Sequence, residues 1–144
     1  AGILGTIPKN LAVTSSRDLA TAQSQKATDA PTFKLPSGTP RLQYEFALSL
    51  MLKQQNFSLA EEALKAFLDK HPRDNLASNA QYWLGETHYV RKNYQDAAFA
   101  FAEGYQKYPE SRKAPDSLLK LGMSLSRMKK SDEACTAFSR FLSK

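Results

Sequence analysis

The chain has 144 residues, with 20 Lys and Arg against 14 Asp and Glu, which gives a formal net charge of +6. Apolar residues make up 42% and charged residues 24%, a composition that is typical of a globular protein and excludes a fully disordered chain. No apolar run in the sequence approaches the ~20 residues that a membrane-spanning helix needs. The single cysteine, Cys135, excludes an internal disulfide and a multi-cysteine metal site.

Residues 1–40 are predicted to form a flexible linker. They contain four prolines and many Ser, Thr and Ala residues, and their apolar residues follow neither a helical nor a strand period. Such a segment buries too little surface to offset the entropy of ordering it. Residues 2–8 hold a short apolar run that could dock elsewhere. Because the chain begins with Ala1 and shows no basic-then-apolar leader, we expect a processed form with its signal peptide removed.

Residues 41–144 are predicted to be helical throughout. Proline is confined to three positions and glycine to three, and the residues between them are mostly good helix formers. Apolar residues recur at i, i+3, i+4 and i+7, and no run alternates as a half-buried strand would. The sequence therefore predicts an all-α domain.

This domain repeats itself at an offset of 37 residues. The pair Leu84-Gly85 falls on Leu121-Gly122. The other coincidences are Pro72 with Pro109, Ala60 with Ala97 and Ala134, and Phe101 with Phe138. A fixed period of this length is typical of stacked helical repeats. We place the repeats at about 41–77, 78–114 and 115–144.

The repeated residue types fit a helix-turn-helix unit. Glycine in the first helix admits a close approach of the second helix, where alanine lies at the crossing and phenylalanine fills the remaining space. Proline ends the second helix, which it cannot continue. Ser58 with Glu61 fits a capping box at the start of a second helix. Ser131 precedes Asp132 and Glu133, which places acids at a positive helix N-terminus.

The order Leu-Gly, aromatic, Ala, Phe, Pro is that of the tetratricopeptide repeat (TPR). The second unit shows it most completely, with Leu84, Gly85, Tyr89, Tyr94, Ala97, Phe101 and Pro109. The period exceeds the usual ~34 residues by about three. We place the extra residues after the prolines and expect them to lengthen the next first helix. The predicted fold is a right-handed α-solenoid of three TPR-like repeats behind a flexible linker.

Three runs extend this resemblance: NAQYWLGE (79–86), AAFAF (97–101) and YPES (108–111). They resemble the C-terminal TPR domain of the YbgF/CpoB family of Tol-Pal-associated periplasmic proteins. The resemblance implies a periplasmic protein that links outer-membrane constriction to peptidoglycan synthesis in cell division, with TolA and a bifunctional peptidoglycan synthase as partners. The family's trimerising N-terminal coiled coil is missing here, so a homo-oligomer would depend on that segment. The alternative is a TPR adaptor or lipoprotein of outer-membrane protein assembly, or another peptide-binding scaffold.

A TPR stack binds partners on the exposed side of its first helices. Counting from the start of each unit, the candidate partner-binding groove consists of Leu52, Lys53, Asn79, Tyr82, Glu86, Tyr89, Val90, Leu119, Met123 and Arg127. This mixed surface lacks a clustered set of Lys, Asn and Arg for a free carboxylate, so it favours an apolar or helical segment. The alternative for Tyr82 and Tyr89 is burial between helices.

We expect no catalytic residue, metal or cofactor. Trp83 is predicted to belong to the core, and Cys135 to be half-buried without the basic partner that a nucleophilic thiol needs. His71 and His88 lie 17 residues apart on different helices, which does not favour zinc. The positive charge is spread out rather than gathered in a stripe with aromatic residues, so we expect no nucleic acid partner and no direct membrane insertion. The predicted function is that of a non-enzymatic protein-protein interaction module.

Overall fold

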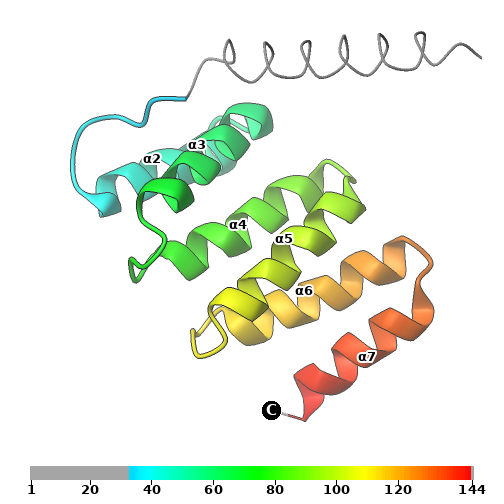
Figure 1. Ribbon diagram of the computed structural model, residues 1–144. Helices are drawn as coiled ribbons and strands as arrows, with labels where there is room; N and C mark the ends of the chain where they lie inside the picture. Colours follow the sequence, from blue (N-terminus) through cyan, green and yellow to red (C-terminus); the bar gives the residue numbers. More distant parts are fainter. Residues whose placement is uncertain (1–32, 144) are drawn as a thin grey trace, which may run out of the picture. The chain divides into compact units, whose positions relative to one another are not determined.

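The computed structural model describes residues 33–143, and it places six helices and no strand in that part of the chain. They are α2 (Pro40–Leu52), α3 (Phe57–Lys70), α4 (Ala77–Val90), α5 (Tyr94–Lys107), α6 (Ala114–Arg127) and α7 (Ser131–Leu142). The all-α prediction is confirmed (Figure 1).

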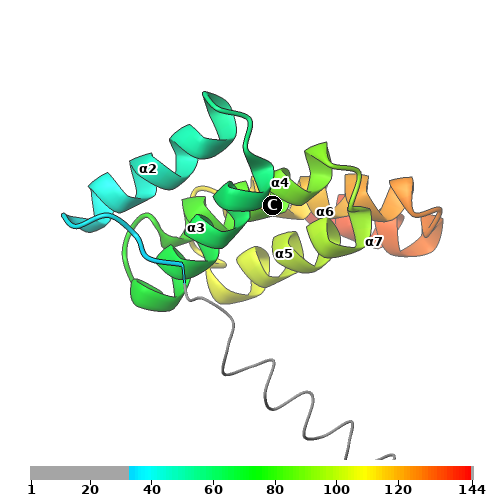
Figure 2. The same ribbon diagram turned by 90° about the horizontal axis from the view of Figure 1, so that it is seen from above.

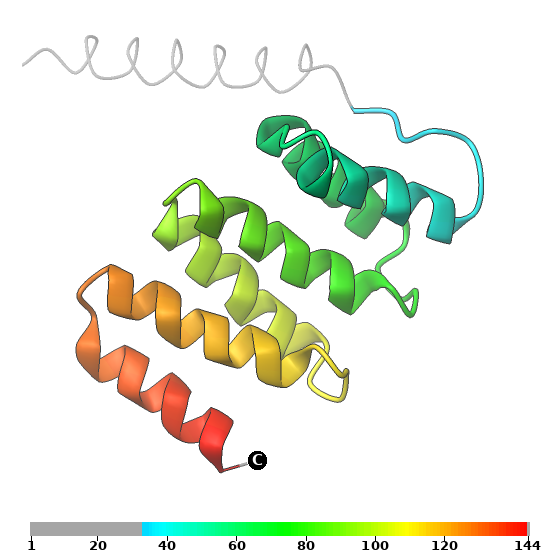
Figure 3. The same ribbon diagram turned by 180° about the vertical axis from the view of Figure 1, so that it is seen from behind.

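The helices follow the repeat seen in the sequence. The first helices α2, α4 and α6 begin 37 residues apart, and so do the second helices α3, α5 and α7. Each pair begins one residue earlier than the sequence predicted. Seen from above, α2 and α4 lie along one side and α3 and α5 along the other (Figure 2). The view from behind brings α2, α4 and α6 to the front (Figure 3). The described residues therefore form a solenoid of three helix pairs, as predicted.

Glycine allows the close crossing in two of the pairs. A Cβ atom added at Gly85 would lie 2.5 Å from Cε1 of Phe101, and one added at Gly122 would lie 2.5 Å from Cε1 of Phe138. Such distances are far below van der Waals contact, so only glycine fits against either ring. The alanine predicted at the crossing is buried in every pair, with 0% exposure at Ala97.

Short polar side chains cap the starts of α2 and α3. The Thr39 hydroxyl oxygen accepts a hydrogen bond from the Leu42 amide at 3.2 Å, with Pro40 at the first position of α2. Oδ1 of Asn56 likewise accepts from the Leu59 amide at 3.2 Å, so Asn56 caps α3. The capping box predicted for Ser58 is wrong, because Ser58 already lies inside α3. The acids predicted in the first turn of α7 are confirmed.

The three extra residues per repeat lie in turns and not in helices. The first helices α4 and α6 have 14 residues each, the same length as α3 and α5. Residues 71–76 form the turn after α3, where Oδ1 of Asp74 accepts from the Leu76 amide at 2.9 Å. The Tyr108 hydroxyl donates to the Pro72 carbonyl at 2.8 Å and so joins this turn to the next one. The predicted lengthening of the first helix is therefore wrong, since the turn has its own hydrogen bonds.

The helical unit begins earlier than the predicted boundary at residue 41. Phe33 and Leu35 pack against the core, and the rings of Phe33 and Phe46 stack with centroids 6.5 Å apart. Nε2 of Gln43 donates to the Pro36 carbonyl at 2.9 Å. Residues 33–39 thus belong to the helical unit. The linker predicted over the preceding residues, and the docking run at 2–8, lie outside the described residues.

We predict that Gly85→Ala lowers the free energy of unfolding by about 1–2 kcal/mol. Overpacking against Phe101 costs more than the roughly 1 kcal/mol that alanine gains in helix propensity. Urea unfolding followed by circular dichroism measures the change. Gly104→Ala is the matched control, because its added Cβ would meet only the Gln81 and Ser117 side chains at 3.2 Å. Equal losses in both variants would contradict the role assigned to the ring contact.

Candidate interaction surfaces

The predicted partner-binding residues all lie on the first helices or at their ends. Leu52 ends α2 and Lys53 is its C-cap. Asn79, Tyr82, Glu86, Tyr89 and Val90 lie on α4, and Leu119, Met123 and Arg127 on α6. Since α4 contacts both α2 and α6, these residues occupy neighbouring helices. We call the side of α2, α4 and α6 that carries them the first-helix face.

Exposure differs along this face. Leu52 and Val90 are 55% and 47% exposed, Lys53 and Arg127 are exposed, and the other six residues are half-buried. The Tyr82 ring packs against Phe101, with centroids 5.7 Å apart. Tyr82 and Tyr89 are thus neither free platforms nor core residues, because both are half-buried and pack against other rings.

Three cations, at the N-cap of α6 and within it, lie over aromatic rings of α4 and α5. Lys113 Nζ, in the N-cap residue, lies 4.5 Å from the centroid of the Tyr82 ring, and Lys120 Nζ lies 4.9 Å from that of Tyr89. The guanidinium of Arg127 lies 6.0 Å from the centroid of the Tyr94 ring. At these distances a cation is attracted by the π face of a ring. Positions 113, 120 and 127 are seven apart, so the cations lie along one side of α6.

Ion pairing and hydrogen bonding hold this row in place. Lys120 Nζ lies 2.9 Å from Oε1 of Glu86, which joins α6 to α4. A hydrogen bond with Tyr89 raises the pKa of Arg127, and burial followed by the charges of Glu86 and Asp116 raises the pKa of Tyr82 to about 12. Lys113 Nζ also lies 3.8 Å from Oδ2 of Asp116, so the face offers aromatic rings beside two ion-paired lysines and the exposed Arg127. The sequence analysis missed Lys113 and Lys120, although their seven-residue spacing could have revealed them.

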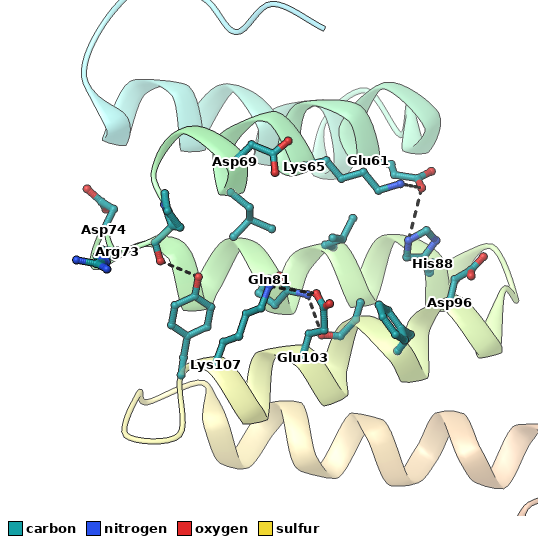
Figure 4. Close-up of a pocket in the computed structure, with 16 residues that line it drawn as sticks. Glu61, Lys65, Asp69, Arg73, Asp74, Gln81, His88, Asp96, Glu103 and Lys107 are labelled. Atoms are coloured by element: carbon teal, nitrogen blue, oxygen red, sulfur yellow. Dashed lines mark hydrogen bonds and ion pairs between the residues drawn. The ribbon is translucent and has the colours of Figure 1, made fainter. Parts of the chain in front are cut away.

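A second surface lies between α3 and α5, away from all ten predicted residues. It is a pocket of about 850 Å³, which we call the trough, with residues 61–69 of α3 and 96–107 of α5 along its sides and residues 81–88 of α4 at its floor. Figure 4 shows Glu61, His88 and Asp96 at one end and Arg73 and Asp74 at the other. The sequence analysis did not find it, because its lining comes from three helices.

A smaller pocket of about 240 Å³ lies one repeat later, between α5 and α7. Each of its lining residues stands 37 positions after a lining residue of the trough. Its floor is apolar, with Leu118 where the trough has Gln81 and Leu125 where the trough has His88. The solenoid thus makes the same hollow twice, and the side chains give each one a different chemistry.

Glu61 connects the first two repeats at one end of the trough. Its carboxylate lies 2.7 Å from Lys65 Nζ, 2.9 Å from an Arg91 nitrogen and 3.6 Å from Nε2 of His88. Burial works against ionisation, but hydrogen bonds from Lys65 and Arg91 and the positive charge nearby lower the pKa of Glu61 to about 2. Burial lowers the pKa of His88, so this histidine is neutral at pH 7.

The remaining candidates are placed as follows. Trp83 is half-buried and packs against the core, as predicted. Cys135 is exposed, so the half-buried position predicted for it is wrong. Helix α7 buries Ala134 and Ala137, and a residue one position after Ala134 is rotated by about 100° away from that face.

The two histidines have polar partners within the fold. Nε2 of His71 lies 2.7 Å from Oε1 of Gln43, and His88 faces Glu61. In residues 33–143 no three His, Cys, Asp or Glu side chains gather as metal ligands would. Over the same residues, none of the helices has the length and apolar character to cross a bilayer.

We predict that Glu61→Gln lowers the free energy of unfolding at pH 7 by about 1–2 kcal/mol, since it removes charge-assisted hydrogen bonds between repeats. The pKa of Glu61 is about 2 in the folded protein, below the ordinary glutamate value of 4.5. The stabilisation is therefore full above pH 4.5 and disappears as the pH falls towards about 2. Urea unfolding over this pH range should show the unfolding free energies of the two proteins converging as the pH falls. Both proteins should also carry His88→Gln, so that titration of this histidine does not contribute. A difference in unfolding free energy that stays constant with pH would then refute the stabilising role assigned to the Glu61 carboxylate.

Comparison with known proteins identifies the repeats. Two family models described as tetratricopeptide repeat match residues 46–117 and 116–144. Two curated relatives from Pseudomonas putida, each named cell division coordinator CpoB, are 44% identical over 55 residues, which is 38% of this chain. The match spans only 20% of the length of those relatives. Over that stretch the domain is CpoB-like, and stacks of such repeats are protein-interaction modules. The sequence repeat, the six helices and both matches agree that this chain belongs to the tetratricopeptide repeat family.

Proposed function

We propose that this chain is a non-enzymatic adaptor in the periplasm that takes part in cell division. The coarse part of this function, protein interaction, follows from the family. The finer part is supported by the similarity to the two relatives named as cell division coordinators. The family resemblance of the repeats suggests TolA and a bifunctional peptidoglycan synthase as the partners.

The observation that carries the proposal is the row of cation-covered rings on the first-helix face. Lys113, Lys120 and Arg127 follow one another at seven-residue intervals beside Tyr82 and Tyr89. Aromatic residues and arginine at a half-exposed surface are the residue types that dominate binding energy in protein interfaces. We propose that this face, with Leu52, Lys53 and Val90 at the ends of α2 and α4, binds a partner helix that presents apolar and acidic side chains.

The test uses Tyr89→Ala/Arg127→Ala and purified soluble domains of TolA and the synthase. Tyr82 is left intact because its ring packs against Phe101 and its loss would disturb the core. We expect the double variant to weaken binding of at least one partner about tenfold or more in fluorescence anisotropy, as for the loss of two interface anchors.

Leu142→Ala/Arg140→Ala is the matched control, since both residues are exposed on α7, outside the first-helix face and the trough. It should bind like the unaltered chain, and both proteins should show the same helical circular dichroism. If neither partner binds any of the chains, the proposed partners are wrong. If a partner binds the double variant as tightly as the unaltered chain, the first-helix face is the wrong surface.

A further inference from the structure

The trough is a second concave surface, separate from the face to which the proposed function is assigned. No Cα atom of α3 lies within 8 Å of one in α5, because both helices pack on α4 and not on each other. Gln81, Leu84 and His88 form the floor. Leu84 and His88 stand three and seven positions after Gln81, so the three side chains share one face of α4. The α4 residues of the first-helix face, Tyr82, Glu86 and Tyr89, lie on a different side of the helix. A ligand in the trough would leave the first-helix face open.

Leu84, Phe99 and Ala100 form an apolar strip within the otherwise polar trough. Leu84 and Ala100 are 7% and 4% exposed. The side-chain amide of Gln81 is already engaged, because Nε2 donates to the Ala100 carbonyl at 2.9 Å and lies 3.4 Å from Oε2 of Glu103. The Phe99 ring lines the same hollow and is 68% exposed. An apolar side chain placed here would cover this ring and remove apolar surface from water.

The charge of the trough is opposite to that of the whole chain. Five carboxylates and three cations line it, although the chain carries a net charge of +6. The neutral His88 adds no positive charge, since burial lowers its pKa. Lysines hold two of the carboxylates, with Lys65 at 2.7 Å from Glu61 and Lys107 at 3.7 Å from Glu103.

Two carboxylates remain available. Asp74 caps the Leu76 amide, and Arg73 lies beside it in the turn. Asp69 and Asp96 are exposed, and within residues 33–143 neither has an ion-pair or hydrogen-bond partner. Both therefore can pair with cations of a ligand without breaking a contact of the fold.

The available carboxylates lie towards opposite ends of the trough. Asp96 is in the first turn of α5, at the end where Figure 4 also shows Glu61 and His88. Asp69 is eight residues after Glu61 on α3, which is about 12 Å along a helix. In an extended peptide, side chains i, i+2 and i+4 point to the same side, and i and i+4 are ~13 Å apart. An extended segment laid along the trough therefore covers, in about four residues, the length of α3 between Asp69 and the end of the trough where Asp96 lies.

We propose that the trough binds an extended segment of a partner protein that has two basic side chains four residues apart and an apolar side chain midway between them. The basic side chains pair with Asp69 and Asp96. The apolar side chain lies between Leu84 and Phe99. An adaptor with this second site holds two partners at once, one on each face.

The test titrates the full chain with the capped peptide SKSLSKS at low ionic strength and follows amide NMR shifts. We expect shifts at Leu84, Phe99 and Ala100, with a dissociation constant of ~1 mM or tighter, and none with SESLSES. Asp69→Asn/Asp96→Asn should weaken binding about tenfold, as for the loss of two partly exposed charge pairs. Phe99→Ala should weaken it severalfold.

Glu110→Gln/Asp132→Asn is the matched control, because it removes two exposed negative charges outside the trough. Equal weakening in this control would mean that only the overall charge attracts the peptide, and would overturn the proposal. Shifts centred on Tyr82 and Tyr89, or no binding of SKSLSKS at several times ~1 mM, would overturn it as well. Tyr89→Ala/Arg127→Ala should leave the peptide affinity unchanged. A negative result for the trough therefore says nothing against the first-helix face, and the reverse also holds.

Discussion

The contact of a phenylalanine ring with a glycine across the helix pair is the constraint on which the arrangement of the second and third repeats depends. At Gly85 the ring of Phe101 occupies the space of a Cβ atom, so α4 and α5 cannot slide or rotate without a clash or a void. In the first pair, Leu48 and Leu64 stand at the positions of Gly85 and Phe101. A larger residue in the first helix is combined there with a smaller one in the second, and Leu48 packs against the core cluster that contains Leu64. Three rigid pairs, each joined to the next through a second and a first helix, give the solenoid its regular spacing.

Two unlike surfaces follow from this stacking. The first helices are neighbours, so their side chains form a continuous face on which the cations of α6 reach the rings of α4. The second helices stand apart and leave hollows between them. Backbone geometry repeats these hollows, but the side chains do not repeat. Gln81 and His88 give way to Leu118 and Leu125 one repeat later, so the floor of the second hollow is apolar and that of the first is mostly polar.

Residue counting along each repeat placed the ten candidate residues on the first helices or at their ends, as the structure has them, because position in a helical repeat determines which side of the helix a residue occupies. It did not reveal what the residues touch. Lys120 reaches Glu86 and Tyr89 across 31 to 34 positions of sequence, and such a contact depends on how two pairs stack. Cys135 was misplaced for the same reason, since the face that α7 buries depends on the rotation of that helix against α6.

The sequence by itself determined the helices, their period of 37 residues and the recurrence of glycine in the first helix with phenylalanine in the second. These features are local propensities or steric matches that recur at a fixed spacing, so they can be read from residue identity. Only the tertiary structure decided that the extra residues form hydrogen-bonded turns, that cations lie over the rings and that a trough opens between α3 and α5. Each of these depends on distances between side chains far apart in the chain, and those distances exist only after the pairs have stacked.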